Sequence, residues 1–271
     1  MKSILLHVDH DSAFPARLQV ALDMARACEG HVTLLQAISY EIFAPGDFYG
    51  SALAAAMPVI KENAEALRAE TEARLAKEDV AWDWRVVYGL AAHRLIELSP
   101  LADVVIVGPS DRSAGGRGPS VIAGDLVLHA PVPVLVVPGD CASFDVTAPA
   151  LVAWNGAPEA AHALRAAVPL LRWASKVWLV SVAEPSDTPR FDLPALDGAE
   201  YLSRHAIACE IVEVPRGAAK IADALFSAAQ MRGCGVLVMG AYGHARLAEM
   251  LLGGVTWHML TEPQMPVLLA H

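Results

Sequence analysis

An internal repeat is the feature of this sequence that most restricts its possible folds. The apolar runs of residues 4–8 and 150–154 each end in a turn-prone residue, Asp9 in the first case and Asn155 in the second. The later apolar runs recur in the same order, and the offset between the copies falls from 146 to about 132 residues because the first copy carries about a dozen extra residues. Self-similarity of this kind is typical of a duplicated structural unit. We therefore predict two copies of one unit in tandem.

The order of patterns within each copy indicates the fold class. Short apolar runs typical of buried parallel strands alternate with alanine-rich helical patterns, the first of which cover residues 15–28 and 158–173. The later strand patterns cover residues 31–35, 84–89, 104–108 and 132–137 in the first copy and 176–180, 209–217, 236–240 and 265–269 in the second. This alternation predicts an α/β chain with two tandem, doubly wound, parallel five-stranded sheets.

The length of 271 residues also suits two compact domains. We place them at residues 1–140 and 148–271, with the boundary in the linker from Pro138 to Pro149. The first copy carries an insertion around Ile42 to Met57, which is rich in Gly, Pro and aromatic residues. We expect that insertion to be a loop.

Charge and composition exclude some classes of function. The formal net charge of -10 and the pI of about 5.4 oppose binding to the phosphate backbone of nucleic acid. The N-terminus does not resemble a signal peptide, and no run approaches the roughly 20 apolar residues that cross a bilayer. The four cysteines are scattered, which is typical of reduced thiols. We expect a cytoplasmic protein that contacts neither membrane nor nucleic acid.

A glycine-rich pattern follows the fourth strand of the second copy. Gly240 and Gly243 are separated by two residues, and Gly253-Gly254 then opens a helix that contains Thr256, so the pattern is G-x-x-G-x₉-G-G-x-T. Glycine lets the backbone approach a ligand closely, and the free N–H groups at a helix N-terminus bind phosphate. A Gly-rich turn with a glycine helix cap would give the same pattern without a ligand.

On these motifs, and over nearly its whole length, the chain resembles the universal stress protein family, whose ATP-binding members carry G-x-x-G-x₉-G-[S/T] after the fourth strand. The resemblance implies an adenine nucleotide alpha hydrolase-like, Rossmann-like fold in each half. It also implies pairing of the two domains through their last strands as an internal pseudo-dimer, and allows further dimerisation of whole chains. The residues that it implies for phosphate and ribose are Met239, Gly240, Gly243, Gly253, Gly254, Val255 and Thr256; those that it implies for adenine are Ala153, Trp154, Asn155 and Val182.

Two positions depart from the family pattern. Gly254 replaces the usual Ser or Thr, which removes one hydroxyl, and Asn155 replaces a carboxylate with an amide. Both changes weaken the expectation of ATP without removing it. Trp154 either shields a base or, as is more common for a Trp at a strand end, packs in the core.

The first copy lacks the loop spacing. Pro109 removes a backbone donor after the fourth strand, and Gly115, Gly116 and Gly118 with Arg112 and Arg117 form either an anion-binding nest or, more commonly, a surface loop. We predict no nucleotide in this copy.

Two other kinds of site were considered. His7, Asp9, His10 and Asp11 carry metal-ligand chemistry, but a strand end with Asp11 or Ser12 capping the next helix explains them better. His244 either donates to phosphate or is solvated. Neither a Walker motif nor a G-x-S-x-G nucleophile elbow occurs, so catalysis has no visible apparatus.

The leading hypothesis is a regulatory, non-enzymatic stress protein that binds ATP, or AMP or ADP, in its second domain. Mg²⁺ would accompany ATP, and slow hydrolysis is allowed but not predicted. The alternative is a nucleotide-free interaction module of the same fold, with the segment from Phe43 to Met57 contacting a partner. A metal- or nucleotide-dependent hydrolase ranks last.

Overall fold

The computed structural model describes residues 1–38, 49–109, 120–183, 193–215, 220–242 and 254–271. Strands and helices alternate in both halves, as predicted. The first half contains β1 Ser3–Val8, α1 Phe14–Cys28, β2 His31–Ile38, α2 Tyr49–Leu75, β3 Ala81–Tyr88, α3 Ala91–Leu98, the short 3₁₀ turn Ser99–Leu101, β4 Val104–Val107, α4 Val121–His129 and β5 Val134–Val136. The second contains β6 Ala150–Ala153, α5 Pro158–Leu171, β7 Val177–Ala183, α6 Ala195–Arg204, β8 Cys209–Pro215, α7 Ile221–Met231, β9 Val236–Gly240, α8 Gly254–Thr261 and β10 Val267–Ala270.

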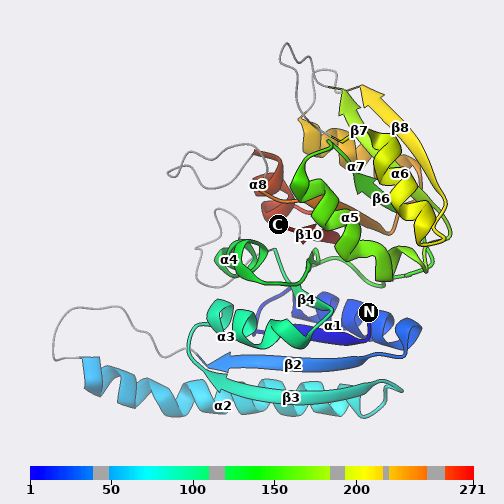
Figure 1. Cartoon of the computed structure of the whole chain (residues 1–271). Coiled ribbons are helices and arrows are strands. Elements are labelled where there is room, and N and C mark those ends of the chain that lie inside the picture. Colours follow the sequence, from blue (N-terminus) through cyan, green and yellow to red (C-terminus); the bar gives the residue numbers. More distant parts are fainter. Residues whose placement is uncertain (39–48, 110–119, 184–192, 216–219, 243–253) are drawn as a thin grey trace.

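All ten strands form one sheet in the order β3-β2-β1-β4-β5-β10-β9-β6-β7-β8 (Figure 1). Strands are parallel within each half, whereas β5 and β10 pair antiparallel, with Leu135 opposite Leu268 and Val136 opposite Val267. The expected α/β fold and the pairing through the last strands are therefore confirmed. The two five-stranded units form a single mixed sheet, because each covers the edge strand that the other would leave unpaired.

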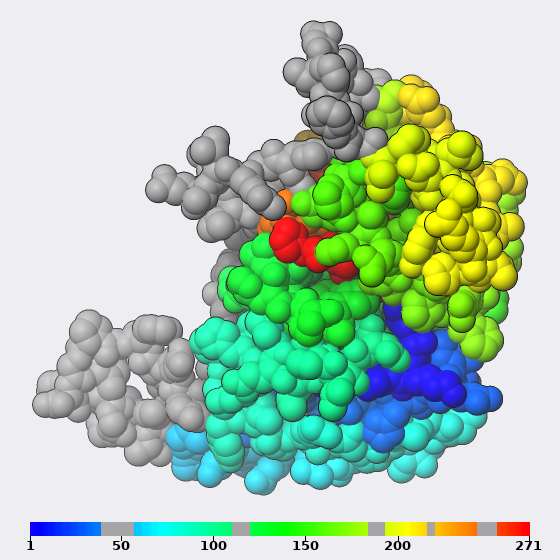
Figure 2. Space-filling view, viewed as in Figure 1, coloured from blue at the N-terminus to red at the C-terminus, as the bar shows by residue number. Residues whose placement is uncertain are grey.

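Helices cover both faces of the sheet and bury apolar residues of both halves. One core lies beneath α1, α2, α5 and α6 and includes Leu135 and Leu268; the other lies beneath α3, α4, α7 and α8 and includes Val134 and Leu269. Residues from the two halves thus meet in each core. Figure 2 shows the C-terminal residues, in red, in the middle of the molecule between the two lobes.

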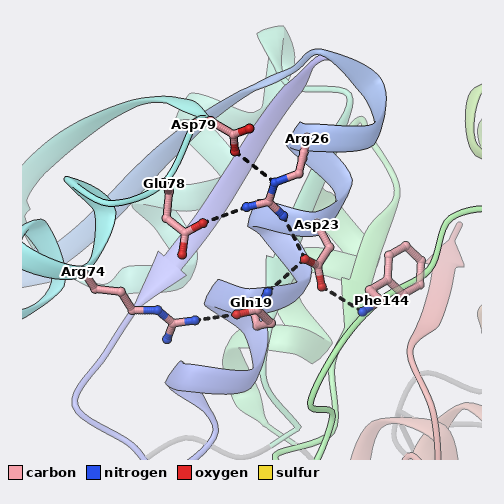
Figure 3. Close-up of polar contacts among 7 residues, drawn as sticks. All are labelled: Gln19, Asp23, Arg26, Arg74, Glu78, Asp79 and Phe144. Carbon is pink, nitrogen blue, oxygen red and sulfur yellow. Dashed lines mark hydrogen bonds and ion pairs between the residues drawn. The ribbon is translucent and has the colours of Figure 1, made fainter.

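The segment between the domains is docked rather than loose. Phe144 and Val146 are buried, and the backbone N–H of Phe144 donates to Asp23 of α1 at 2.9 Å. Asp23 also accepts from Gln19 and Arg26, and Arg26 donates to Glu78 and Asp79 in the turn between α2 and β3 (Figure 3). This network joins α1, the turn before β3 and the linker.

One expectation about the first half is wrong. The insertion was predicted to be a loop, but residues from Tyr49 onward belong to α2, which continues through Pro58 to Leu75. The alanines of this segment favour a helix more strongly than its Gly and Pro residues favour a loop, because alanine is the strongest helix former. Residues 39–48 lie outside the part of the chain that the structure describes.

Among the described residues no helix is both long and apolar enough to cross a membrane. All four cysteines are free thiols. Burial raises the pKa of the Cys234 thiol to about 11, which keeps that thiol protonated near neutral pH.

Candidate functional site

A hollow of about 260 Å³ opens at the carboxyl ends of β6, β7 and β9 in the second half. This is the switch point of the half-sheet, where β6 lies between β7 and β9. Residues predicted for the nucleotide site that line it are Ala153, Trp154, Asn155, Val182, Met239, Gly240, Gly254, Val255 and Thr256. The other two, Gly243 and Gly253, lie outside the described residues, as does His244.

The hollow also has walls that the sequence did not indicate. Val180 of β7, with Ile221 and Leu225 of α7, forms an apolar side, and Ala157, Glu159 and Ala160 come from the start of α5. Ile221 and Leu225 follow an ordinary amphipathic helix pattern, so nothing in the sequence separated them from core residues. The sequence did contain a signal for Glu159, because Pro158 is typical of the first position of a helix. The first turn of a helix that follows β6 must lie at this edge of the sheet, so Glu159 could have been expected there.

The turn from β6 into α5 uses the side chain of Asn155. Its Oδ1 accepts a hydrogen bond from the backbone N–H of Ala157 at 3.2 Å, and Gly156 between them has a φ of 78°. A positive φ favours glycine at this position. Asn155 is exposed and therefore has its amide group left to donate to a ligand.

Trp154 is a core residue as well as a lining residue. It is 5% exposed, its indole Nε1 donates to the carbonyl oxygen of Leu193 at 3.1 Å, and its ring lies against Gly198 of α6. The packing role accounts for this ring, and nothing in its surroundings requires a stacked base.

Gly240 has a structural reason that the motif did not reveal. A Cβ atom there would lie 2.4 Å from the backbone carbon of Glu159 and 2.6 Å from the nitrogen of Ala160. The first turn of α5 therefore packs directly on the end of β9. Gly240 serves the contact between helix and strand whether or not a ligand is present.

The N-terminus of α8 forms the third side of the hollow. Gly254, Val255 and Thr256 line the hollow and form the first turn of α8, and the N–H groups of a first helical turn lack intrahelical partners. The hydroxyl oxygen of Thr256 accepts from the backbone N–H of Tyr242 at 3.3 Å, which leaves its proton to donate. A Cβ on Gly254 would meet no atom within 4 Å.

Glu159 is the one charged residue in the described lining. Its Oε2 exposes less than 1 Å² and has no hydrogen-bond partner among the described residues. A buried carboxylate oxygen without a donor is unfavourable, because it has lost its water without replacement.

In the first half, two of the candidate metal ligands, His7 and Asp11, contact Arg17 of α1. Asp11 forms an ion pair with the fully buried Arg17, whose Nε donates to the carbonyl oxygen of His7. The expected cap is wrong, because α1 begins after Ala13 without a side-chain cap. Burial, together with Arg17, lowers the pKa of His7 to about 3.

Within the described ranges, no three His, Cys, Asp or Glu residues cluster as metal ligands do. The glycines and arginines of the first-copy loop, residues 110–119, lie outside them.

Comparison with known proteins agrees with the repeat and the fold. The model of the universal stress protein family matches residues 1–138 and again residues 148–271. The chain belongs to the universal stress protein family. A universal stress protein of Mycobacterium tuberculosis is 29% identical over 225 residues, which cover 73% of each chain. A universal stress protein from Archaeoglobus fulgidus superposes with a TM-score of 0.67 and 16% identity over 99% of this chain and 96% of that one.

Some members of the family bind adenine nucleotides. A universal stress family protein from Arabidopsis thaliana was solved with AMP bound, and another universal stress protein was solved in complex with cAMP. Each is a single-domain match that covers about half of this chain, 51% and 47%, with a TM-score of 0.36.

Proposed function

We propose that this universal stress protein binds one adenine nucleotide, ATP, ADP or AMP, in the hollow of its second domain, as a regulatory ligand in the cytoplasm. The observation that carries the proposal is the convergence of β6, β7, β9 and α8 on one hollow, lined by residues that the family pattern implies. Apolar side chains on one side suit a base, and free helix N–H groups on the other suit phosphate.

The residues present fit such a ligand. Val180, Val182 and Leu225 offer an apolar surface for adenine, while the N-terminus of α8 offers backbone donors beside an open Gly254. Mg²⁺ would bind through the phosphates of ATP and neutralise part of their charge. We propose binding rather than turnover, because the described lining holds no pair of groups arranged as nucleophile and base.

Isothermal titration of the purified full chain with ATP, ADP and AMP, with and without Mg²⁺, tests this proposal. Analysis of small molecules released on denaturation complements it. We expect saturable binding of one nucleotide per chain. Absence of released nucleotide and of binding at millimolar concentrations would favour the alternative, a nucleotide-free interaction module.

A further inference from the structure

The unpartnered oxygen of Glu159 requires an explanation that the family motif does not provide. Buried polar atoms are almost always hydrogen-bonded, so each exception points to a missing partner. Glu159 lines the hollow and is only partly buried as a residue, but its Oε2 exposes less than 1 Å² and has no donor among the described residues. An ionised carboxylate only accepts hydrogen bonds, so the missing partner must be a donor.

The strand order locates Glu159 within the hollow. Val180 and Val182 belong to β7, at one end, and Gly254 to Thr256 belong to the helix that follows β9, at the other. Glu159 stands on the first turn of α5, which begins after the middle strand β6, and its backbone lies against Gly240 at the end of β9. The first turn of α5, which carries Glu159, therefore lies between the apolar side and the phosphate-binding side.

Different parts of a nucleotide differ in what they offer such an acceptor. Phosphate oxygens are acceptors and carry the same sign of charge as Glu159, so they do not suit it. The group between the base and the phosphates is the ribose, whose 2′ and 3′ hydroxyls are both donors. A hydroxyl donating to a carboxylate makes a short, charge-assisted hydrogen bond.

We infer that Glu159 is a specificity-determining residue that turns its carboxylate into the hollow and accepts a hydrogen bond from a ribose hydroxyl, so that the site selects ribonucleotides over deoxyribonucleotides. This inference rests on the proposed function. A site built to bond a hydroxyl disfavours an analogue without it, because its buried polar atom is then left unpaired.

The test compares the affinities of the full chain for ATP, 2′-deoxyATP and 3′-deoxyATP by titration calorimetry at fixed Mg²⁺. The ratio of affinities is the readout, since a change of charge at Glu159 alters the affinity for every triphosphate but cancels in the ratio. We expect the wild-type chain to prefer ATP over at least one deoxynucleotide by about tenfold to a hundredfold.

Three variants make the comparison specific. Glu159→Ala should reduce the preference to about twofold or less, and Glu159→Gln should retain part of it because its amide oxygen still accepts. Glu200→Ala removes an equally charged but exposed residue, paired with Arg204 on α6, and should leave the preference unchanged. Circular dichroism and thermal unfolding establish that each variant is folded.

The possible outcomes separate this inference from the proposed function. If the wild-type chain binds no adenine nucleotide, the proposed function fails. If it binds ATP with a preference that Glu159→Ala does not change, this inference alone is overturned. Glu159→Ala could instead lower the affinity for ATP only when Mg²⁺ is present, while the preference for ATP over the deoxynucleotides stays unchanged. That result would identify the carboxylate as a cation ligand and would also overturn this inference.

Discussion

The phenol of Tyr242 in the second domain donates a hydrogen bond to the backbone carbonyl oxygen of Gly124 in the first, at 3.2 Å. Gly124 lies within α4, and Tyr242 belongs to the expected phosphate loop, as the last residue that the structure describes before residue 254. The backbone N–H of Tyr242 meanwhile donates to Thr256 at the start of α8. One residue thus links the first domain to the helix that forms one side of the proposed nucleotide site.

Removing the Tyr242 hydroxyl should weaken this link without a change in packing. We expect Tyr242→Phe to reduce the free energy of unfolding by about 0.5–1.5 kcal/mol, the usual net contribution of one hydrogen bond. Chemical denaturation measures it. Tyr201→Phe is the matched control, because it keeps the ring contact with His205. Equal effects of the two substitutions would show that the hydrogen bond to Gly124 contributes nothing.

The same residue gives a prediction at high pH. Burial, with a smaller contribution from the charge of Asp125, raises the pKa of Tyr242 from 10.0 to about 12. The folded state therefore holds this proton more tightly than the unfolded state. Its contribution to stability is complete below about pH 10 and is lost as the pH rises to about 12. Unfolding measured across this range should show a smaller alkaline loss in Tyr242→Phe; parallel curves would contradict the assignment.

The sequence predicted the repeat and the alternation of strands and helices, because buried parallel strands leave long apolar runs in a chain. The pairing of β5 with β10 was expected only from the resemblance to the universal stress protein family. It also indicated the lining residues that belong to the glycine motif and the strand ends. It did not reveal Glu159, Ile221 or Leu225, whose positions depend on how α5 and α7 pack across the sheet. It misread residues 49–57, where Gly and Pro suggested a loop within what is a helix.

Gly240 has a packing role in addition to the ligand-binding role that the glycine motif implies. A side chain at this position would overlap the backbone of Glu159 and Ala160, and backbone cannot move aside as a side chain can. We expect Gly240→Ala to destabilise the protein by about 1–3 kcal/mol or more, even without nucleotide. Thermal unfolding measures it, with Gly254→Ala as the control, since a Cβ there meets nothing within 4 Å. Similar melting temperatures for the two variants would contradict the close contact between α5 and β9.

His7 should make the fold sensitive to acid. Burial and the nearby Arg17 lower its pKa from 6.5 to about 3, so the folded state disfavours the charged imidazole. The stability from this group is complete above about pH 6.5 and falls by up to about 1.4 kcal/mol per pH unit as the pH drops toward 3.

Asp11 acts in a separate range. Burial favours a higher pKa for Asp11, but the hydrogen bonds and charge of Arg17 outweigh burial and lower this pKa below 3.8. The stability that the ionised Asp11 contributes is therefore lost only as the pH falls below about 3.8. Titration of the histidine signals by nuclear magnetic resonance, with His7→Gln for assignment, should find one imidazole still neutral at about pH 5. Full protonation of His7 at that pH in the folded protein would contradict its burial.

Gly254 offers the most direct test of how this chain departs from its family. The family pattern places a hydroxyl residue here, and the described part of the chain leaves room for one, because a Cβ would contact none of its atoms within 4 Å. Gly254→Ser adds a donor at the N-terminus of α8, beside the free N–H groups of the first turn. We expect ATP affinity to rise by about threefold to tenfold, equivalent to one net hydrogen bond. Stability without nucleotide should not fall, since serine is also the better helix residue.

Calorimetric titration of both chains, with Gly254→Ala as the control for a Cβ without a hydroxyl, measures the gain in ATP affinity. An equal gain from alanine would assign it to the stiffer helix start, and no gain from either would place the phosphates away from α8.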